Sequence, residues 1–291
     1  MIHSIENKKL SIHINSVGAE LSSIKSKNSV KEFLWQGDPK IWGSQAPVLF
    51  PVVGGLKKET YIYKSKQYTL PKHGFIRYNQ DLVSRQISDT SITFSLSSNK
   101  KTLLVYPFQF LFDINFELVD NRLKISHTIK NKGNEPMYFS VGGHPAFNCP
   151  LHSSHSYEDY YIQIDTKQEK PGSYILDKNG LISQNMRTVF QDDKIWLTSD
   201  LFNNDALIFK GLNAKTASLV HKTNGTVLMV DLSDFPDLGI WAKPNAPYVC
   251  IEPWLGYADV VETNQQIEDK EGIQKLEAGQ THTSSYIITI F

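Results

Sequence analysis

Apolar and polar residues alternate with a period of two along much of this chain, which is typical of strands that bury one face. The alternation is clearest over residues 10–14, 92–96 and 112–118. The pair Asp120-Asn121 interrupts it, and it resumes over 123–125. A polar pair between two alternating runs predicts an antiparallel hairpin.

Turn signals recur between these runs, and helical periodicity is nearly absent. Asn179-Gly180 and Asn224-Gly225 suit tight hairpin turns, because both residue types adopt positive φ at low cost. Residues 206–209 and 227–232 are further strand candidates, and 39–42 predicts one helical turn at most. Many short strands with frequent turns favour an all-β fold, either a sandwich or a barrel. With no linker or repeat in its 291 residues, the chain is expected to form a single domain, 1–291.

Charge and cysteine content restrict the partners. Thirty Lys and Arg residues balance thirty Asp and Glu residues, so the basic surface of a nucleic-acid-binding protein is not expected. No apolar run is long enough to cross a bilayer, and the polar N-terminal residues do not resemble a signal peptide. Two cysteines, Cys149 and Cys250, give neither a disulfide framework nor a zinc pattern. We therefore expect a cytoplasmic protein with no nucleic-acid or membrane partner.

Two histidines stand beside glycines, outside the strand pattern. His73 precedes Gly74 and lies close to Arg77, and His144 follows Gly142-Gly143 and precedes Pro145. The glycines permit close approach to the backbone, and the proline would hold the second imidazole in one orientation. Each segment could also be a structural turn with a solvated histidine.

Two acidic residues have an unusual setting. Glu252 ends an apolar strand candidate and is followed by Pro253 and Trp254. A buried carboxylate is costly unless it is paired, so Glu252 has either a functional role or a place facing water. Trp254 could offer a flat face to a sugar ring or belong to the core. Asp205 precedes the strand at 206–209, where it is either a ligand for sugar hydroxyls or a plain turn residue.

Two histidines and a carboxylate suit proton transfer to and from oxygen, with pKa values brought near neutral pH. The sequence spacing predicts no metal site. His152 and His155 come nearest to ligand spacing, but their Ser-rich surroundings favour a solvated loop. There is no phosphate-binding loop or dinucleotide fingerprint, so no cofactor is expected.

These motifs, taken in order, resemble the aldose 1-epimerase (galactose mutarotase) family. The resemblance rests on residues 46–54, on His73-Gly74-Phe75 with Arg77, on residues 142–147, and on Glu252-Pro253-Trp254 with Asp259. It covers most of the chain and is strongest toward the bacterial branch that includes the LacX-type proteins. It implies a large antiparallel β-sandwich, often called a supersandwich, with a sugar in an open cleft.

The resemblance also implies residue roles. His144 would act as general acid on the ring oxygen, Glu252 as general base on the anomeric hydroxyl, and His73 as a hydrogen-bonding partner near the ring oxygen. Asp205 would bind sugar hydroxyls. The chain departs from the family pattern at Gly55, where related proteins often carry an arginine; Lys57, Lys58 or Arg77 would have to replace that positive charge.

The function expected on these grounds is interconversion of the α and β anomers of a hexose by opening and closing its ring. Two alternatives remain: a hexose-6-phosphate 1-epimerase, and a sugar-binding protein of the same fold without turnover. A small-molecule sugar is the expected partner. Whether the chain also pairs with a second copy as a homodimer is left open by the sequence.

Overall fold

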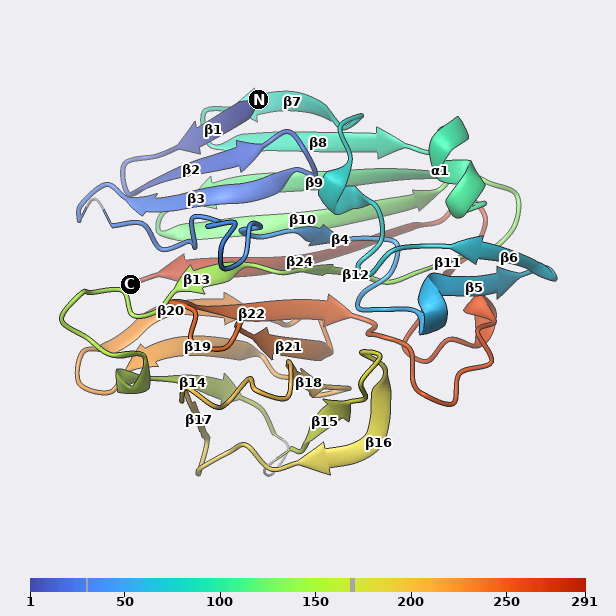
Figure 1. Cartoon of the computed structure of the whole chain (residues 1–291). Coiled ribbons are helices and arrows are strands. Elements are labelled where there is room, and N and C mark those ends of the chain that lie inside the picture. The colour runs from blue at the N-terminus through green and yellow to red at the C-terminus, as the bar shows by residue number, and fades with distance from the viewer. Residues whose placement is uncertain (30, 168–170) are drawn as a thin grey trace.

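The computed structural model describes residues 1–29, 31–167 and 171–291, and most of its strands belong to two large antiparallel sheets (Figure 1). The larger sheet has nine strands. In spatial order they are β17 (Lys194–Trp196), β14 (Tyr160–Asp165), β19 (Thr216–His221), β20 (Gly225–Asp231), β24 (Thr281–Ile290), β10 (Arg122–Asn131), β9 (Phe110–Val119), β8 (Ser91–Ser97) and β7 (Val83–Ser88).

The second sheet has eight strands. Seven of them follow the order β16 (Ile182–Arg187), β15 (Ser173–Leu176), β18 (Leu207–Phe209), β21 (Asp237–Trp241), β22 (Tyr248–Leu255), β12 (Val141–Gly143) and β4 (Val48–Leu49), and β13 (Ala146–Asn148) also pairs with β22. Most of the predicted site residues lie on a strand of this second sheet or directly beside one.

Smaller elements complete the fold. They are a three-stranded sheet of β1 (Ile2–Glu6), β2 (Leu10–Asn15) and β3 (Glu20–Ser26), the pairs β5 (Thr60–Tyr63) with β6 (Lys66–Thr69) and β11 (Met137–Phe139) with β23 (Gln274–Leu276), the helix α1 (Lys100–Val105), and the 3-10 turns η1 (Lys57–Glu59), η2 (Ile76–Tyr78), η3 (Tyr157–Asp159) and η4 (Ile267–Asp269). No helix among the described residues has the length and apolar character needed to cross a membrane.

The predicted all-β antiparallel fold and its hairpins are confirmed. Asp120-Asn121 joins β9 to β10, whose register begins with Val119 opposite Arg122. Asn179-Gly180 lies between β15 and β16, and Asn224-Gly225 lies where β19 turns into β20. In each case the turn residues separate two runs that pair with each other, as the alternation requires.

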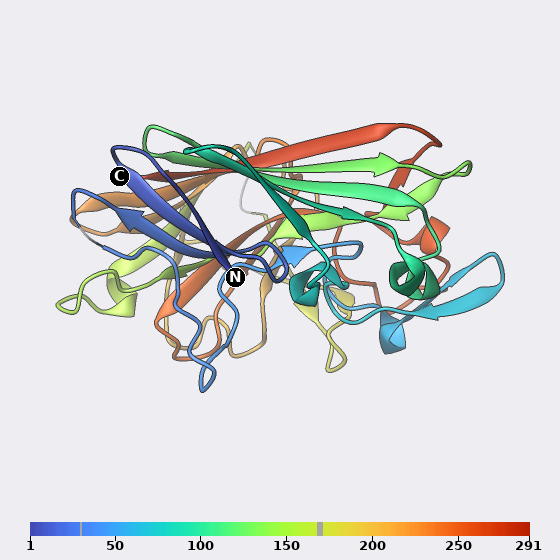
Figure 2. The same ribbon diagram turned by 90° about the horizontal axis from the view of Figure 1, so that it is seen from above.

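The two large sheets pack face to face around an aromatic core, as the layers in Figure 2 show. Phe50, directly after β4, stacks on Phe112 of β9 with ring centroids 4.5 Å apart. Tyr286 of β24 reaches Gly143 of β12 so closely that a Cβ on this glycine would lie 2.5 Å from the tyrosine Oη. Side chains of β9, β10 and β24 alternate between buried and more exposed positions, whereas all eight residues of β22 are buried.

The position of β22 explains why it carries a buried acid. The sequence predicts a strand that ends at Glu252, but β22 continues to Leu255, so Glu252 lies within a strand that is covered on both faces. Successive side chains of a strand point to opposite faces, so Cys250, Glu252 and Trp254 share one face. The alternative in which Glu252 faces water is wrong, since only 1% of this residue is exposed.

Candidate active site

A cavity of about 240 Å³ lies over one face of the eight-stranded sheet. Every site residue predicted from the sequence lines it. These residues are His73, Arg77, His144, Asp205, Glu252 and Trp254. They come from four separate segments of the chain, so the fold assembles a single site from motifs that are distant in sequence.

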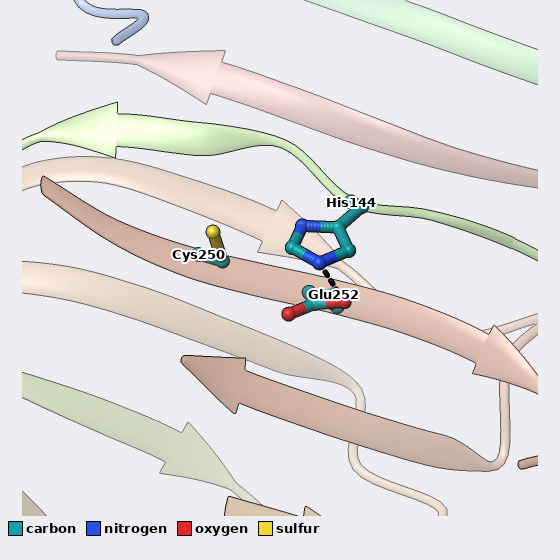
Figure 3. Close-up of side chains that lie close together, drawn as sticks. All are labelled: His144, Cys250 and Glu252. Atoms are coloured by element: carbon teal, nitrogen blue, oxygen red, sulfur yellow. Dashed lines mark ion pairs between the residues drawn. The ribbon is translucent and has the colours of Figure 1, made fainter. Parts of the chain in front are cut away.

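His144 and Glu252 form the centre of this site. His144 follows β12, and its backbone N–H donates to the carbonyl of Pro47 (3.1 Å). Its Nε2 lies 3.3 Å from Oε2 of Glu252 on the neighbouring strand β22, as the dashed line in Figure 3 marks. Both residues are buried, with 7% of His144 and 1% of Glu252 exposed. An acid and a base in direct contact at a cavity wall can exchange a proton with each other and with a bound molecule.

Burial moves the pKa values of this pair apart. It raises the pKa of the Glu252 carboxyl to about 8, against an opposing effect of Lys72. It lowers the pKa of the His144 imidazole to about 3, and the positive charge of Arg77 acts in the same direction. Of the two values expected near neutrality, the pKa of Glu252 moves toward it and the pKa of His144 moves away from it, because loss of water disfavours each charged form. Near neutral pH the pair therefore holds one proton, on Glu252.

His73 lies edge-on to His144, with ring centroids 5.5 Å apart. Its Nδ1 accepts the backbone N–H of Gly54 (3.1 Å), and burial holds its pKa well below the ordinary value. A neutral imidazole that accepts at Nδ1 carries its proton on Nε2. Gly74 makes this placement feasible, because a side chain here would collide with the carbonyl of Phe50. His73 thus presents a hydrogen-bond donor at the cavity wall.

Tryptophans form much of the remaining wall. Trp254 is 4% exposed and belongs to a buried cluster, and it also lines the cavity, so its contact with a sugar ring stays a prediction. Its ring lies across Gly239, where a Cβ would be 2.5 Å from Cζ2 of the indole. Trp42 and Trp241 line the same cavity and pack on His144, which the sequence analysis did not predict.

Charged groups stand around the rest of the opening. Asp205 is exposed and lies in the loop that leads into β18. Arg77 lies in η2 and donates from a terminal guanidinium nitrogen to Oγ of Ser44 (3.2 Å). Lys72 also lines the cavity, and its position beside His73 was the available sequence signal. Lys57 is not part of the cavity lining, and its Nζ donates to the carbonyl of Val261 (2.8 Å).

Two other groups of interest lie outside the cavity lining. Asp259 forms a buried ion pair with Lys270 (3.1 Å) and accepts the backbone N–H of Lys57, which gives it a structural role. His152 contacts Nζ of Lys31, and His155 contacts the hydroxyl of Tyr160, in a partly exposed loop. The two histidines thus lie in a partly exposed loop, as expected, with their ring centroids 5.0 Å apart.

One group in the described residues has metal-ligating atoms close together. Single ligand atoms of His144, Cys250 and Glu252 lie within 4.8 Å of one another. Sequence spacing predicts no such cluster, because two of the residues come from β22 and the third from the segment after β12.

Comparisons with known proteins identify the family of this chain. The family model for aldose 1-epimerase matches residues 1–289. Over 299 aligned residues the chain is 32% identical to the plasmid-encoded protein LacX of Lactococcus lactis subsp. lactis, covering 100% of this chain and 99% of LacX.

Two solved structures share both the fold and its extent. A galactose mutarotase related enzyme from Lactobacillus acidophilus superimposes with a TM-score of 0.92 at 38% identity, covering 100% of this chain and 97% of the other. A galactose mutarotase-like protein from Lactobacillus casei gives a TM-score of 0.94 at 28% identity, with both chains covered completely. With its cavity, its paired acid and base and these matches over its whole length, the chain belongs to the aldose 1-epimerase family.

Proposed function

We propose that this protein is an aldose 1-epimerase that interconverts the α and β anomers of a hexose by acid–base opening and closure of the sugar ring. The observation that carries the proposal is the contact of 3.3 Å between Nε2 of His144 and Oε2 of Glu252 at the wall of a cavity. The oxygens that exchange protons in this reaction, O1 and O5, are both bonded to C1. They are therefore neighbours, and a neighbouring acid and base can reach both at once.

The proton that the pair holds is the one that the reaction needs. Its transfer from Glu252 to His144 gives a carboxylate and an imidazolium. The carboxylate then takes the proton of the O1 hydroxyl while the imidazolium donates to O5. The C1–O5 bond breaks, the C1–O1 bond becomes a carbonyl, and the open-chain aldehyde results.

Ring closure reverses these roles. Rotation about C1–C2 presents the other face of the aldehyde, the O5 hydroxyl returns its proton to His144, and O5 attacks C1. Glu252 returns its proton to O1, which leaves the carboxylate and the imidazolium. Transfer of the proton from His144 back to Glu252 then restores the free pair. Each well-placed proton-transfer group typically contributes on the order of 10²–10⁴-fold in rate.

The other residues of the lining suit sugar binding. Nε2–H of His73 can donate to the ring oxygen, Asp205 can accept from hydroxyls, and Trp254 offers an apolar face to the C–H side of the ring. A volume of about 240 Å³ is small beside the 300–1,000 Å³ of sites for drug-sized ligands, and so it favours a monosaccharide.

The test is the optical rotation of freshly dissolved α-D-glucose and α-D-galactose. We expect the wild-type protein to accelerate the approach to equilibrium and the Glu252→Gln variant to lose this acceleration. The variant keeps the shape of the side chain, so a loss with unchanged circular dichroism assigns the defect to proton transfer. Binding of sugar without acceleration by the wild type would instead support a sugar-binding protein without turnover.

A second candidate is a hexose-6-phosphate 1-epimerase, because two cationic side chains, Lys72 and Arg77, line the cavity. The same measurement with α-D-glucose 6-phosphate separates the two substrates. A higher kcat/KM for the phosphorylated sugar, reduced by Lys72→Ala more than that for glucose, would favour this candidate. A cytoplasmic location and a homodimer stay predictions.

A further inference from the structure

Cys250 is a buried thiol next to the proposed catalytic pair, and the proposed reaction does not use it. It lies two residues before Glu252 on β22, so both side chains leave the strand on the same face (Figure 3). No part of Cys250 is exposed, and it is a free cysteine. With His144 it completes a set of one nitrogen, one sulfur and one carboxylate oxygen within 4.8 Å.

We infer that His144, Cys250 and Glu252 form a binding site for a thiophilic divalent cation such as Zn²⁺, and that this cation inhibits the protein by occupying the groups that move protons. The inhibition rests on the proposed function, whereas the binding site does not.

The ligand set is of the kind that zinc prefers. Imidazole, thiolate and carboxylate are all zinc ligands, and three protein ligands leave the fourth tetrahedral position for water or a sugar hydroxyl. Zinc bonds of about 2.0–2.3 Å place tetrahedral ligands roughly 3.5 Å apart, so side-chain rotations must close about 1 Å. Mg²⁺ and Ca²⁺ prefer all-oxygen sites and gain little from a thiolate.

An incomplete hydrogen-bond set points to the same place. Nδ1 of His144 is buried and has no hydrogen-bond partner among the described residues, and Oε2 of Glu252 makes no hydrogen bond there beyond its ion-pair contact with Nε2 of His144 (3.3 Å). A buried polar atom without a partner is unfavourable, and a cation between Glu252 and His144 would satisfy the carboxylate directly.

Charge balance supports a dication here. A thiolate and a carboxylate carry two negative charges, and with a neutral imidazole they leave Zn²⁺ with a net charge of zero, which suits a buried site. Burial raises the pKa of the Cys250 thiol well above its ordinary value, and a coordinating metal displaces that proton. Lys72 and Arg77 line the cavity and oppose any cation, so the thiolate is essential to the affinity.

Co²⁺ is the probe, because tetrahedral Co²⁺ with a thiolate ligand absorbs visible light and shows a sulfur-to-metal charge-transfer band. We expect both signals when Co²⁺ is added to the wild-type protein, and Zn²⁺ in excess should remove them. Cys250→Ser should lose the charge-transfer band. Cys149→Ser is the matched control, since Cys149 is also buried and free but lies outside the cluster, and it should keep the band.

The activity assay tests whether the bound cation inhibits the reaction. Zn²⁺ should inhibit the wild type and Cys149→Ser reversibly, with recovery on addition of EDTA, and Cys250→Ser should need at least about tenfold more Zn²⁺ for the same inhibition. The proposed site would be overturned if Cys250→Ser were as sensitive to Zn²⁺ as the wild type, or if it kept the Co²⁺ charge-transfer band. Metal spectra that depend on Cys250 in a protein without epimerase activity would instead overturn only the proposed function.

Discussion

The indole of Trp42 lies against the imidazole of His144, with ring centroids 5.1 Å apart and ring planes inclined by 29°. A turn at residues 38–42 holds the tryptophan there, since the backbone N–H of Trp42 donates to the carbonyl of Asp38 (2.8 Å). The backbone carbonyl of Trp42 accepts a hydrogen bond from Nε1–H of Trp35 (2.8 Å). The face of an aromatic ring attracts a positive charge, so this contact favours the imidazolium form that His144 adopts during the proposed reaction.

Replacing Trp42 should therefore slow the reaction more than it weakens binding. A stacked cation on an indole gains about 0.5–2 kcal/mol, so we expect Trp42→Ala to lower kcat by roughly 2- to 30-fold. Trp42→Phe should recover part of the loss, because a smaller ring keeps the interaction. Polarimetric measurement of kcat and KM decides the point. A rise in KM at constant kcat would show that Trp42 serves sugar binding instead.

The pH dependence of the rate follows from the pair of His144 and Glu252. The singly protonated pair is the competent form, and its pKa values of about 3 and about 8 leave a broad plateau between them. We expect kcat/KM to fall above about pH 8, as the proton on Glu252 is lost, and to stay constant through the mildly acidic range. The measurement is mutarotation in EDTA, with the rate without protein subtracted at each pH. A narrow bell centred near pH 6 would contradict it.

The stability of the protein should depend on Glu252 in the opposite sense to that of a paired carboxylate. Its pKa rises from 4.5 to about 8 on folding, so between these values the folded state binds more protons than the unfolded state. The contribution of Glu252 protonation to the free energy of unfolding is fully present below pH 4.5 and is lost as the pH rises toward 8. The free energy of unfolding of Glu252→Gln, relative to that of the wild type, should therefore rise by a few kcal/mol between pH 4.5 and pH 8. Urea unfolding at several pH values measures the gain, and Glu117→Gln, at an exposed position of β9, should show none.

The buried ion pair of Asp259 and Lys270 should support the fold and not the reaction. Both side chains are 3% exposed, and Nζ of Lys270 also donates to the carbonyl of Tyr257 (2.6 Å). Lys270→Met leaves the carboxylate buried without its partner, which should cost about 3–5 kcal/mol. Thermal unfolding measures this loss, and kcat of the remaining folded protein should equal that of the wild type. A loss of kcat without a loss of stability would place Asp259 in the reaction.

The strands and the central residues of the site could be predicted from the sequence because each depends on local pattern. Period-two alternation specifies which face of β9 and β10 is buried, and a turn pair specifies where they reverse. His144 and Glu252 were recognisable because glycine, proline and tryptophan beside a titratable group break that pattern. The helix α1 was missed, since six residues are too short for periodicity, and it depends on the Asn99 side chain accepting two backbone N–H groups.

Other features depend on contacts between distant segments, which one sequence does not reveal. Trp42 reaches His144 only because a turn before β4 lies beside the segment after β12. Cys250 lies near His144 because β12 pairs with β22. The separation of the pKa values of His144 and Glu252 also follows from burial, which their sequence neighbours do not specify.

Adjacent glycines at the cavity should respond differently to substitution. Gly54 has a φ of +72°, and a Cβ there would lie 2.5 Å from Cβ of Ala258, whereas a Cβ at Gly55 would meet no atom within 4 Å. We therefore expect Gly54→Ala to destabilise the protein by more than 1 kcal/mol and Gly55→Ala to change its stability by less than about 0.5 kcal/mol. Thermal unfolding compares the two, and equal losses would contradict the difference in packing.

The open space at Gly55 also makes it a site for changing substrate preference. Gly55→Arg should fold with nearly the wild-type stability and add a cation to a cavity that Lys72 and Arg77 already line. A third positive charge attracts a phosphate more than a neutral hydroxyl, so the ratio of KM for glucose 6-phosphate to KM for glucose should fall. Gly55→Gln is the control, because it adds comparable bulk without charge. If both variants change the ratio equally, bulk rather than charge at this position controls which sugar the cavity accepts.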